Sequence, residues 1–552
     1  MARRPFGLLF ATLWTLGTLA GCSRVGTTAS GGGANGRVNA WTRPGVLRIV
    51  NLVEPDTLNP LLGNSQIDSD LANFWGGMLL NWSDKNEFVP ELATEVPTLA
   101  NGGISADGKT IVYHLRPGVL WHDGKPFTAN DVVFTWHAVL NKSNNVTSTV
   151  GYDIVSGIDV RDPHTIAVHL KSAWAPFVAS FFAPSATPYP ILPEHLLAGY
   201  ADINRVPFNS QPVGTGPFIV ERWHRGSRIV FRANPKYWRG VPKLRTITYE
   251  AIPNENTVET LLQTHEADLD YNSPSTKISQ SRAIAGYRTT LTAFTQFGQL
   301  ALNERTPALA DVRVRKALWY ALDIPAIIRD VTHGVDVPGH TDQPTFSWAY
   351  NPDIPRYPFD AARAGALLDA AGWKRGSDGI RVKNGARLTL TVAGISGSAV
   401  GDAVDALAQR NWHDAGIDLQ LKNFTSSLAF ASFGEGGILQ TGKFDIAFFS
   451  WLNGTDPDDS VQYMCDQFPP HGQNIGHFCN REFDRQERIA LGSNDRAVRK
   501  RAYDAAQRIW ADEVPAVIPW FVRRISVANA DLKNYRPAHA VTSFWNPYDW
   551  TI

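Results

Sequence analysis

The hydrophobic pattern of this chain switches repeatedly between the period of a helix and that of a strand. Thr128 can cap a helix over residues 129–140, with Asp131 as the reciprocal partner, and Val132 and Trp136 lie on one face of that helix. Residues 68–80 and 402–415 also have a helical pattern, the second ending at Gly416, and residues 516–522 have the pattern of a strand. Residues 444–450 form a short, nearly continuous apolar run, which is typical of a buried strand. Over 552 residues, with no repeat at any fixed period, this alternation predicts a mixed α/β architecture in more than one lobe.

Composition excludes two classes of protein. Hydrophobic residues make up 43% and charged residues 19%, a balance that excludes a mostly disordered chain. Lys plus Arg equals Asp plus Glu, at 52 each. The chain therefore has no excess of basic residues that would bind phosphate groups, and we expect no nucleic-acid partner.

The N-terminus has the layout of an export signal. Residues 3–4 are both Arg, and the apolar run 6–20 has 15 residues. A bilayer span needs about 20, so residues 1–21 are predicted to be a signal peptide. Ala20 and Gly21 then precede Cys22, which resembles a bacterial lipobox, with Cys22 acylated as the new first residue. The alternative is an ordinary signal peptide with a chance Cys.

Residues 22–45 are predicted to be the lipidated Cys and a flexible tether. Residues 23–36 are rich in Gly, Ser and Thr and would reach on the order of 20 Å as a flexible coil. No later segment has 18 uninterrupted apolar residues. We therefore expect an extracytoplasmic protein held at the membrane by lipid, on the periplasmic side or the cell surface.

Two further cysteines lie close together in the sequence. An exported chain meets oxidising conditions, so Cys465 and Cys479 are predicted to form a disulfide. The alternatives are two free thiols or a metal pair with His471 and His477, although the spacing fits no familiar zinc pattern.

A phosphate-binding motif is matched by residues 103–110, GISADGKT. A working P-loop follows a buried strand and opens a helix. Here residues 97–102 are not strand-like, and IVYHLRP after the motif has the pattern of a strand. We interpret the segment as a β-turn. The sequence also has no G-x-S-x-G, H-E-x-x-H or C-x-x-C, so we expect no enzyme and no cofactor.

Seven segments occur in an order that is typical of one family. They are FVPELATEVP (88–97), DGKTIVYHLRPGVLWHDGKPFTANDVVFTWHAVL (107–140), PVGTGPF (212–218), NPKYWRG (234–240), LNERTPALADVRVRKALWYALD (302–323), NWHDAG (411–416) and DEVPAVIP (512–519). Together they resemble the extracytoplasmic solute-binding proteins of the peptide, dipeptide and nickel ABC importers, solute-binding protein family 5.

The resemblance implies a two-lobed periplasmic-binding-protein fold, class II type and cluster C, with an extra subdomain in the first lobe. Its predicted divisions are lobe I at 46–80, 208–291 and 515–552, the extra subdomain at 81–207, and lobe II at 292–514. Ligand would be enclosed between lobes that close about a hinge. The implied partners are an ABC permease and its ATPase subunits, and the receptor is expected to be a monomer.

The resemblance carries over less well to the ligand-binding residues. In peptide-binding members, a Trp after a buried strand is followed by an Asp that pairs with the peptide amino group. Trp451 matches the Trp, but Gly454 stands at the Asp position and the loop is about one residue short. Asp456 either substitutes after a shift or only matches the acidic residue before Pro in the family. Trp451, Asn453 and Asp456 are the first candidates for ligand contact.

Four further residues are weaker candidates for the cavity. Asn64 follows the first strand, and Trp348 and Tyr350 lie in a Pro-rich loop of the second lobe. Asn474 lies between the two cysteines. For each of them, structural packing is an equal alternative to ligand contact.

The leading hypothesis is an importer receptor that captures a small solute, most readily a peptide. The missing Asp also allows a sugar, an opine-like compound or a nickel complex. The same fold could serve a sensor, and an exported hydrolase is a remote alternative that would need a nucleophile with a base in reach.

Overall fold

The computed structural model describes residues 38–552, except residues 64, 186–187 and 540–541. The predicted signal peptide, Cys22 and Asn64 therefore lie outside the described residues. Within the described part, no helix is both long enough and apolar enough to cross a membrane.

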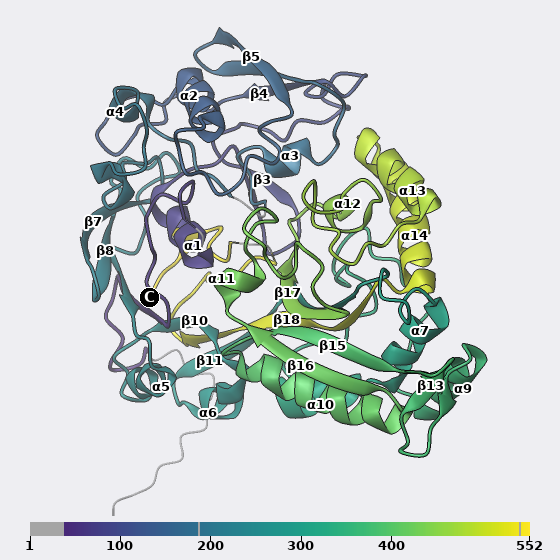
Figure 1. Ribbon diagram of the computed structural model, residues 1–552. Coiled ribbons are helices and arrows are strands. Elements are labelled where there is room, and N and C mark those ends of the chain that lie inside the picture. Colours follow the sequence, from purple (N-terminus) through teal and green to yellow (C-terminus); the bar gives the residue numbers. More distant parts are fainter. Residues whose placement is uncertain (1–37, 64, 186–187, 540–541) are drawn as a thin grey trace, which may run out of the picture. The chain divides into compact units, whose positions relative to one another are not determined.

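Ten strands form one large mixed sheet, in the order β16-β15-β17-β11-β18-β10-β1-β9-β8-β7 (Figure 1). Their bounds are β1 (Val46–Asn51), β7 (Phe218–His224), β8 (Arg228–Ala233), β9 (Thr246–Ala251), β10 (Leu269–Ser273), β11 (Tyr287–Leu302), β15 (Thr389–Ile395), β16 (Asp418–Phe424), β17 (Ile446–Leu452) and β18 (Ala516–Asn529). Strands from distant parts of the sequence are thus neighbours in this sheet.

The long strands β11 and β18 join the two halves of this sheet. They pair antiparallel, with an irregularity in register between Ala293 and Phe297. On one side of this point β18 pairs with β10, and on the other β11 pairs with β17. Separate hydrophobic cores lie on the two sides, one built around β1 and β9 and the other around β15 and β17. The predicted two-lobed α/β fold is confirmed.

The first core also takes in a smaller sheet. Its strands are β4 (Thr110–His114), β5 (Val155–Asp162) and β6 (Thr165–Leu170), and β2 (Leu80–Trp82) pairs with β3 (Phe88–Pro90) nearby. The helices of this half are α1 (Gln66–Trp75), α2 (Ala129–Leu140), α3 (Phe177–Ser180), α4 (Glu194–Leu197), α5 (Glu255–Gln263) and α6 (Ile278–Ala283). Short helical turns are η1 (Pro207–Asn209), η2 (Ser275–Lys277) and, near the C-terminus, η4 (Pro547–Asp549).

Local sequence explains two features of this half. Thr128 and Asp131 form the predicted capping box at the start of α2, in which the Asp131 carboxylate accepts a hydrogen bond from the Thr128 N–H at 2.9 Å. The PVGTGPF segment passes close to the end of α1. A Cβ at Gly214 would lie 1.8 Å from the carbonyl oxygen of Trp75, so only glycine fits there.

The second half alternates helices with the strands β15 to β17. Its helices are α7 (Val312–Ala321), α8 (Ile324–Ala326), η3 (Ile327–Val331), α9 (Ala361–Ala370), α10 (Ala399–Ala415), α11 (Ser426–Ala429), α12 (Ser460–Tyr463), α13 (Arg481–Gly492) and α14 (Arg496–Glu513). A small sheet is formed by β12 (Lys374–Arg375), β13 (Arg381–Lys383) and β14 (Ala386–Arg387). Helices α13 and α14 pack side by side at the right of Figure 1.

Several element boundaries differ from those predicted. The helix expected from residue 68 to 80 is α1, which ends at Trp75 because two glycines follow it. The strand expected at 516–522 continues to Asn529, where its partner β11 keeps it paired. The GISADGKT segment is the predicted turn, with the Gly108 N–H donating to the Ser105 carbonyl at 2.9 Å.

Cys465 and Cys479 form the predicted disulfide, with their Cα atoms 4.6 Å apart. The alternative metal pair is not formed, since the described residues contain no cluster of three or more His, Cys, Asp or Glu side chains placed to hold a metal ion.

Candidate ligand-binding site

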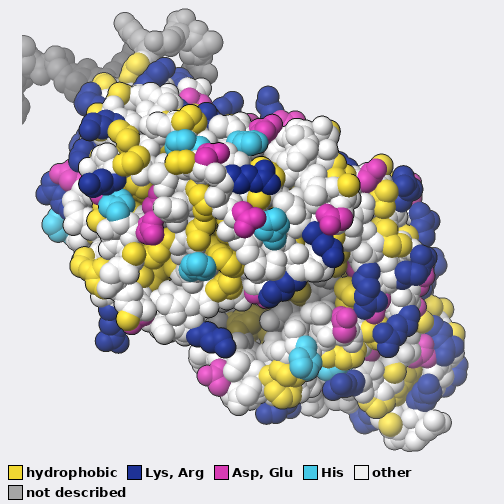
Figure 2. Space-filling model, turned by 90° about the horizontal axis from the view of Figure 1, so that it is seen from above, with side chains coloured by type: hydrophobic (Ala, Val, Ile, Leu, Met, Phe, Trp, Pro, Cys, Tyr) yellow, Lys and Arg dark blue, Asp and Glu magenta, His cyan; other side chains and the backbone are white. Residues whose placement is uncertain are grey.

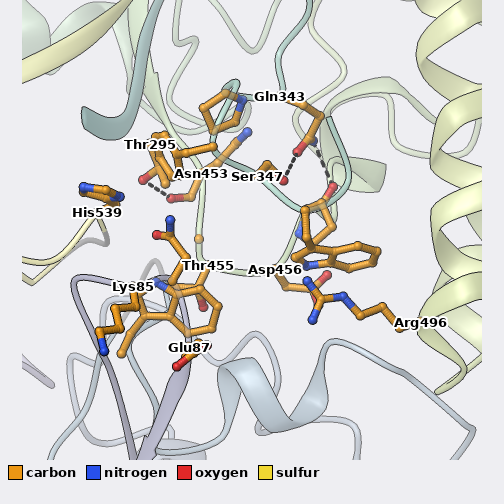
Figure 3. A pocket seen from close by; sticks show the side chains of 17 residues that line it. Lys85, Glu87, Thr295, Gln343, Ser347, Asn453, Thr455, Asp456, Arg496 and His539 are labelled. Carbon is orange, nitrogen blue, oxygen red and sulfur yellow. Dashed lines mark hydrogen bonds between the residues drawn. The ribbon is translucent and has the colours of Figure 1, made fainter. Parts of the chain in front are cut away.

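A cavity of about 290 Å³ lies beside the loop that follows β17. Its lining comes from distant parts of the sequence, which the fold brings together (Figure 3). The lining residues are Trp82, Lys85, Asn86, Glu87, Thr295, Gln343, Pro344, Phe346, Ser347, Trp348, Asn453, Gly454, Thr455, Asp456, Pro457, Arg496 and His539.

The loop is fixed at its start by Asn453, which is buried. The Thr295 hydroxyl donates to the Asn453 carbonyl at 2.7 Å, and the Asn453 side-chain N–H donates to the Asp342 carbonyl at 3.1 Å. Gln462 donates to its side-chain oxygen at 3.3 Å. The backbone carbonyl of Asn453 therefore ties the loop to β11, and its side-chain amide, a predicted ligand contact, is used in tying the loop to Asp342 and Gln462.

Asp456 lines the cavity but already has a partner. Both of its carboxylate oxygens accept hydrogen bonds from the guanidinium of Arg499 on α14, at 2.6 and 2.8 Å. Burial lowers the pKa of Arg499, but Asp456 and Tyr503 together outweigh burial, and the pKa of Arg499 is raised. The side chains are only 9% exposed for Arg499 and 13% for Asp456, so this is a largely desolvated, bidentate pair.

Between these two residues the loop offers few polar side chains. Gly454 contributes only backbone at the place where the family resemblance puts an anchoring Asp. The hydroxyl of Thr455 is buried and has no hydrogen-bond partner within the described residues.

Trp348 and Arg496 form one wall of the cavity. Trp348 packs edge-on against Tyr503 with ring centroids 5.9 Å apart. The Arg496 guanidinium lies 5.0 Å from the centre of the Trp348 ring, a cation–π distance. In Figure 3 Arg496 extends from α14 toward the cavity, with Asp456 beside it.

Lys85 and Glu87 face the cavity from the turn between β2 and β3. Both side chains are exposed to solvent. His539, near the C-terminus, lies on the same cavity and is half-buried. Burial lowers the pKa of His539, although Asp84 opposes this shift.

Three acidic side chains lie behind the loop and are buried: Asp342, Asp459 and Glu487. Burial raises the pKa of each of them. Neighbouring carboxylates add to the rise, because Glu487 and Asp342 both repel a charge on Asp459. This cluster sits under the cavity wall, since Gln343 donates to the Asp342 carboxylate at 3.1 Å and to the Pro457 carbonyl at 3.0 Å.

Trp451 belongs to a second cavity, of about 590 Å³. Phe430, Phe449, Ile475 and Pro470 share this lining. Trp451 immediately precedes the loop of the first cavity in the chain, so the two cavities flank the end of β17. The second cavity is mainly apolar in character and would suit an aliphatic or aromatic side chain.

The structure places Tyr350 and Asn474 outside the first cavity. The Tyr350 hydroxyl lies 3.5 Å from an Arg356 nitrogen. The Asn474 side chain donates to the carbonyls of Met464 and Phe478, at 2.9 and 2.7 Å, within the disulfide-closed loop. That Trp451, Asn453, Asp456, Trp348, Tyr350, Asn474 and Asn64 contact ligand stays a prediction.

Sequence reasoning did not find Lys85, Glu87, Arg496 or His539. Each lies in a polar segment with no motif of its own, and only tertiary structure brings them to the cavity. A faint signal exists for Arg496, because it is the first residue of α14 after its Asp495 cap. Its side chain is therefore held near the helix terminus.

Comparisons with known proteins agree with this geometry. The family model described as "Bacterial extracellular solute-binding proteins, family 5 Middle" matches residues 87–469. Protein XP55 of Streptomyces lividans is 31% identical over 459 residues, which cover 82% of this chain and 79% of that protein. The oligopeptide-binding protein AppA of Bacillus subtilis is 26% identical over 540 residues, which cover 97% of this chain and 96% of that protein.

The solved structure of Bacillus subtilis AppA in complex with a nonapeptide has a similar fold. It matches with a TM-score of 0.74 and 24% identity, and the match covers 92% of this chain and 99% of that one. At this identity the likeness establishes the fold.

Proposed function

Because the chain belongs to the bacterial extracellular solute-binding proteins of family 5, we propose that it is the receptor of an ABC importer and captures a peptide between its two lobes. It would then deliver the peptide to a membrane permease and its ATPase subunits. The relatives named for oligopeptide binding support the peptide as ligand.

The observation that carries this proposal is the composition of the first cavity. Lys85 and Glu87 come from the half of the chain that packs with β1, whereas Gln343, Trp348 and Asp456 come from the half that packs with β17. A ligand that contacts both halves binds better when they are closed, and this differential affinity is what lobe closure requires.

The second cavity extends the site along the end of β17. An extended peptide with a polar end in the first cavity would place a side chain beside Trp451 and Phe430, since successive residues of an extended chain are about 3.3 Å apart. Burial of one such side chain would contribute about 1.5–3 kcal/mol.

We further propose that the receptor is held at the membrane by lipid on Cys22 and binds its ligand without chemical turnover. The signal-like residues 1–21 and the small residues before Cys22 support the anchor. Family members are binding proteins, which supports the absence of turnover.

The test is titration calorimetry of the mature chain against tri- to nonapeptides. We expect a peptide to bind, and Trp348→Ala to weaken it about tenfold or more because one cavity wall is lost. Phe359→Ala is the control, since Phe359 is 44% exposed and lies outside both cavities. Binding of a sugar, an opine-like compound or a nickel complex but of no peptide would overturn the peptide assignment.

A further inference from the structure

We propose that the cavity beside Gly454 receives a carboxylate group of the ligand, which is bound by the Arg496 guanidinium that lies over the Trp348 ring. The cavity does not bind a free α-ammonium group. This inference rests on the peptide receptor proposed above and names the chemical class of its ligand. The expected ligands are peptides with a blocked N-terminus and a free carboxylate.

The first step concerns the carboxylates that could bind an ammonium group. Gly454 has no side chain, and both oxygens of Asp456 are engaged by Arg499 at 2.6 and 2.8 Å. An ammonium group at Asp456 would have to displace one of these hydrogen bonds and would lie close to the Arg499 charge. Like charges in a partly desolvated site repel strongly, so Asp456 is a poor ammonium anchor.

The second step concerns Arg496. It makes no ion pair with any residue that the structure describes. Trp348 supports its guanidinium at 5.0 Å, and Figure 3 shows the side chain reaching toward the cavity from α14. A guanidinium is planar, and two of its N–H donors match the two oxygens of a carboxylate. Arg496 therefore offers a positive charge to a ligand carboxylate, and its contact with Trp348 orients the guanidinium.

The third step concerns the uncharged residues of the lining. Thr455 and His539 also line the cavity. Burial lowers the pKa of His539 from its ordinary value, so the ring is uncharged near neutral pH. Neither residue adds a negative charge that would repel a carboxylate.

One competing carboxylate remains at the cavity, that of Glu87. It is exposed, as Arg496 is, so solvent weakens an ion pair with either residue. Lys85 lies two residues away on the same turn and offsets the charge of Glu87. The charged lining residues are Lys85 and Arg496 against Glu87 and Asp456, two of each sign, so the cavity has no excess of negative charge.

The face seen from above carries a hollow, with Lys and Arg as well as Asp and Glu side chains around it (Figure 2).

The experiment uses the mature chain and Ala/Phe tri- and tetrapeptides, each in four forms: free, N-acetylated, C-amidated and blocked at both ends. Calorimetry gives the dissociation constants. We expect acetylation to leave affinity unchanged or improved, and amidation to weaken it about two- to fivefold, since an ion pair with the exposed Arg496 is lost.

Two variants assign the effect to its residue. In Arg496→Gln the preference for acid over amide should largely disappear. In Glu87→Gln the ratio between the affinities of the free and acetylated peptides should stay within about twofold of the parent's ratio. Arg501→Gln, an exposed Arg on the same helix, controls for the altered charge of α14, and a melting curve of each variant checks folding.

The outcomes are distinguishable. If acetylation abolishes binding and Glu87→Gln weakens the free peptide, the ammonium group binds at Glu87 and the inference is overturned, while the peptide receptor stands. An unchanged acid preference in Arg496→Gln also overturns it. If no peptide binds in any form, the proposed peptide function fails, and the inference fails with it.

Discussion

Arg499→Met should destabilise the second lobe through the charge of its partner, Asp456. Methionine keeps much of the apolar stem of Arg499 but removes the guanidinium that holds both Asp456 oxygens. It also removes the 3.1 Å hydrogen bond that Arg499 donates to the Tyr503 hydroxyl. The variant leaves a nearly buried carboxylate without its cation.

The expected loss in free energy of unfolding follows from the exposure of the pair. Removing one partner of a buried ion pair costs about 3–5 kcal/mol. Asp456 is 13% exposed and faces a cavity that water can enter, so we expect about 3 kcal/mol, the lower end of the range. Arg501→Met on the same helix should change the free energy by less than about 0.5 kcal/mol, since Arg501 is exposed.

Urea unfolding followed by tryptophan fluorescence at pH 7.5 measures the loss. A loss in Arg499→Met no larger than that in Arg501→Met would refute the reasoning, because it would show that the Asp456 carboxylate does not need its cation.

Three other predictions concern stability. Asp459→Asn should raise the melting temperature relative to the parent, and the difference should grow as the pH rises from about 4 to 8. The reason is that burial raises the pKa of Asp459, so its ionisation in the parent opposes folding. A melting temperature lower than the parent's at pH 8 would contradict this. Replacing Cys465 and Cys479 by Ala should lower the free energy of unfolding by about 3 kcal/mol, measured by urea titration against the oxidised parent. Gly214→Ala should lower the free energy of unfolding by about 3 kcal/mol or more, since the added Cβ would lie 1.8 Å from the Trp75 carbonyl oxygen. Gly157→Ala is the control that should stay folded, because no heavy atom lies within 4 Å of a Cβ at that position.

Much of the fold was predictable because its local signals are unambiguous. The capping box at Thr128 and the glycine after α10 set helix ends at the expected residues. The extension of β18 to Asn529 was not predictable, since its length depends on pairing with β11, which lies more than 200 residues earlier. The single sheet that joins the lobes likewise follows from this long-range pairing.

The site was less predictable than the fold. The segment after β17 was found because a buried strand followed by Trp is visible in the sequence, and the structure places its loop at the first cavity. Arg496 and His539 were not found, because a lone charged or titratable residue in a polar segment carries no pattern. The side chain of Asn453 is used to hold the loop, a role that no local signal separates from ligand contact.

Asp456 illustrates why the identity of a residue does not establish its role. From the sequence, an Asp two residues after the expected anchor position can replace that anchor. In the structure its carboxylate is held by Arg499, which lies 43 residues later on a different element. Availability of a charged group depends on its partners, and these are set by the fold. Gly454 stands where the family resemblance implies an acid, and Arg496 lines the same cavity, so the sign of the ligand's charge becomes the quantity to measure.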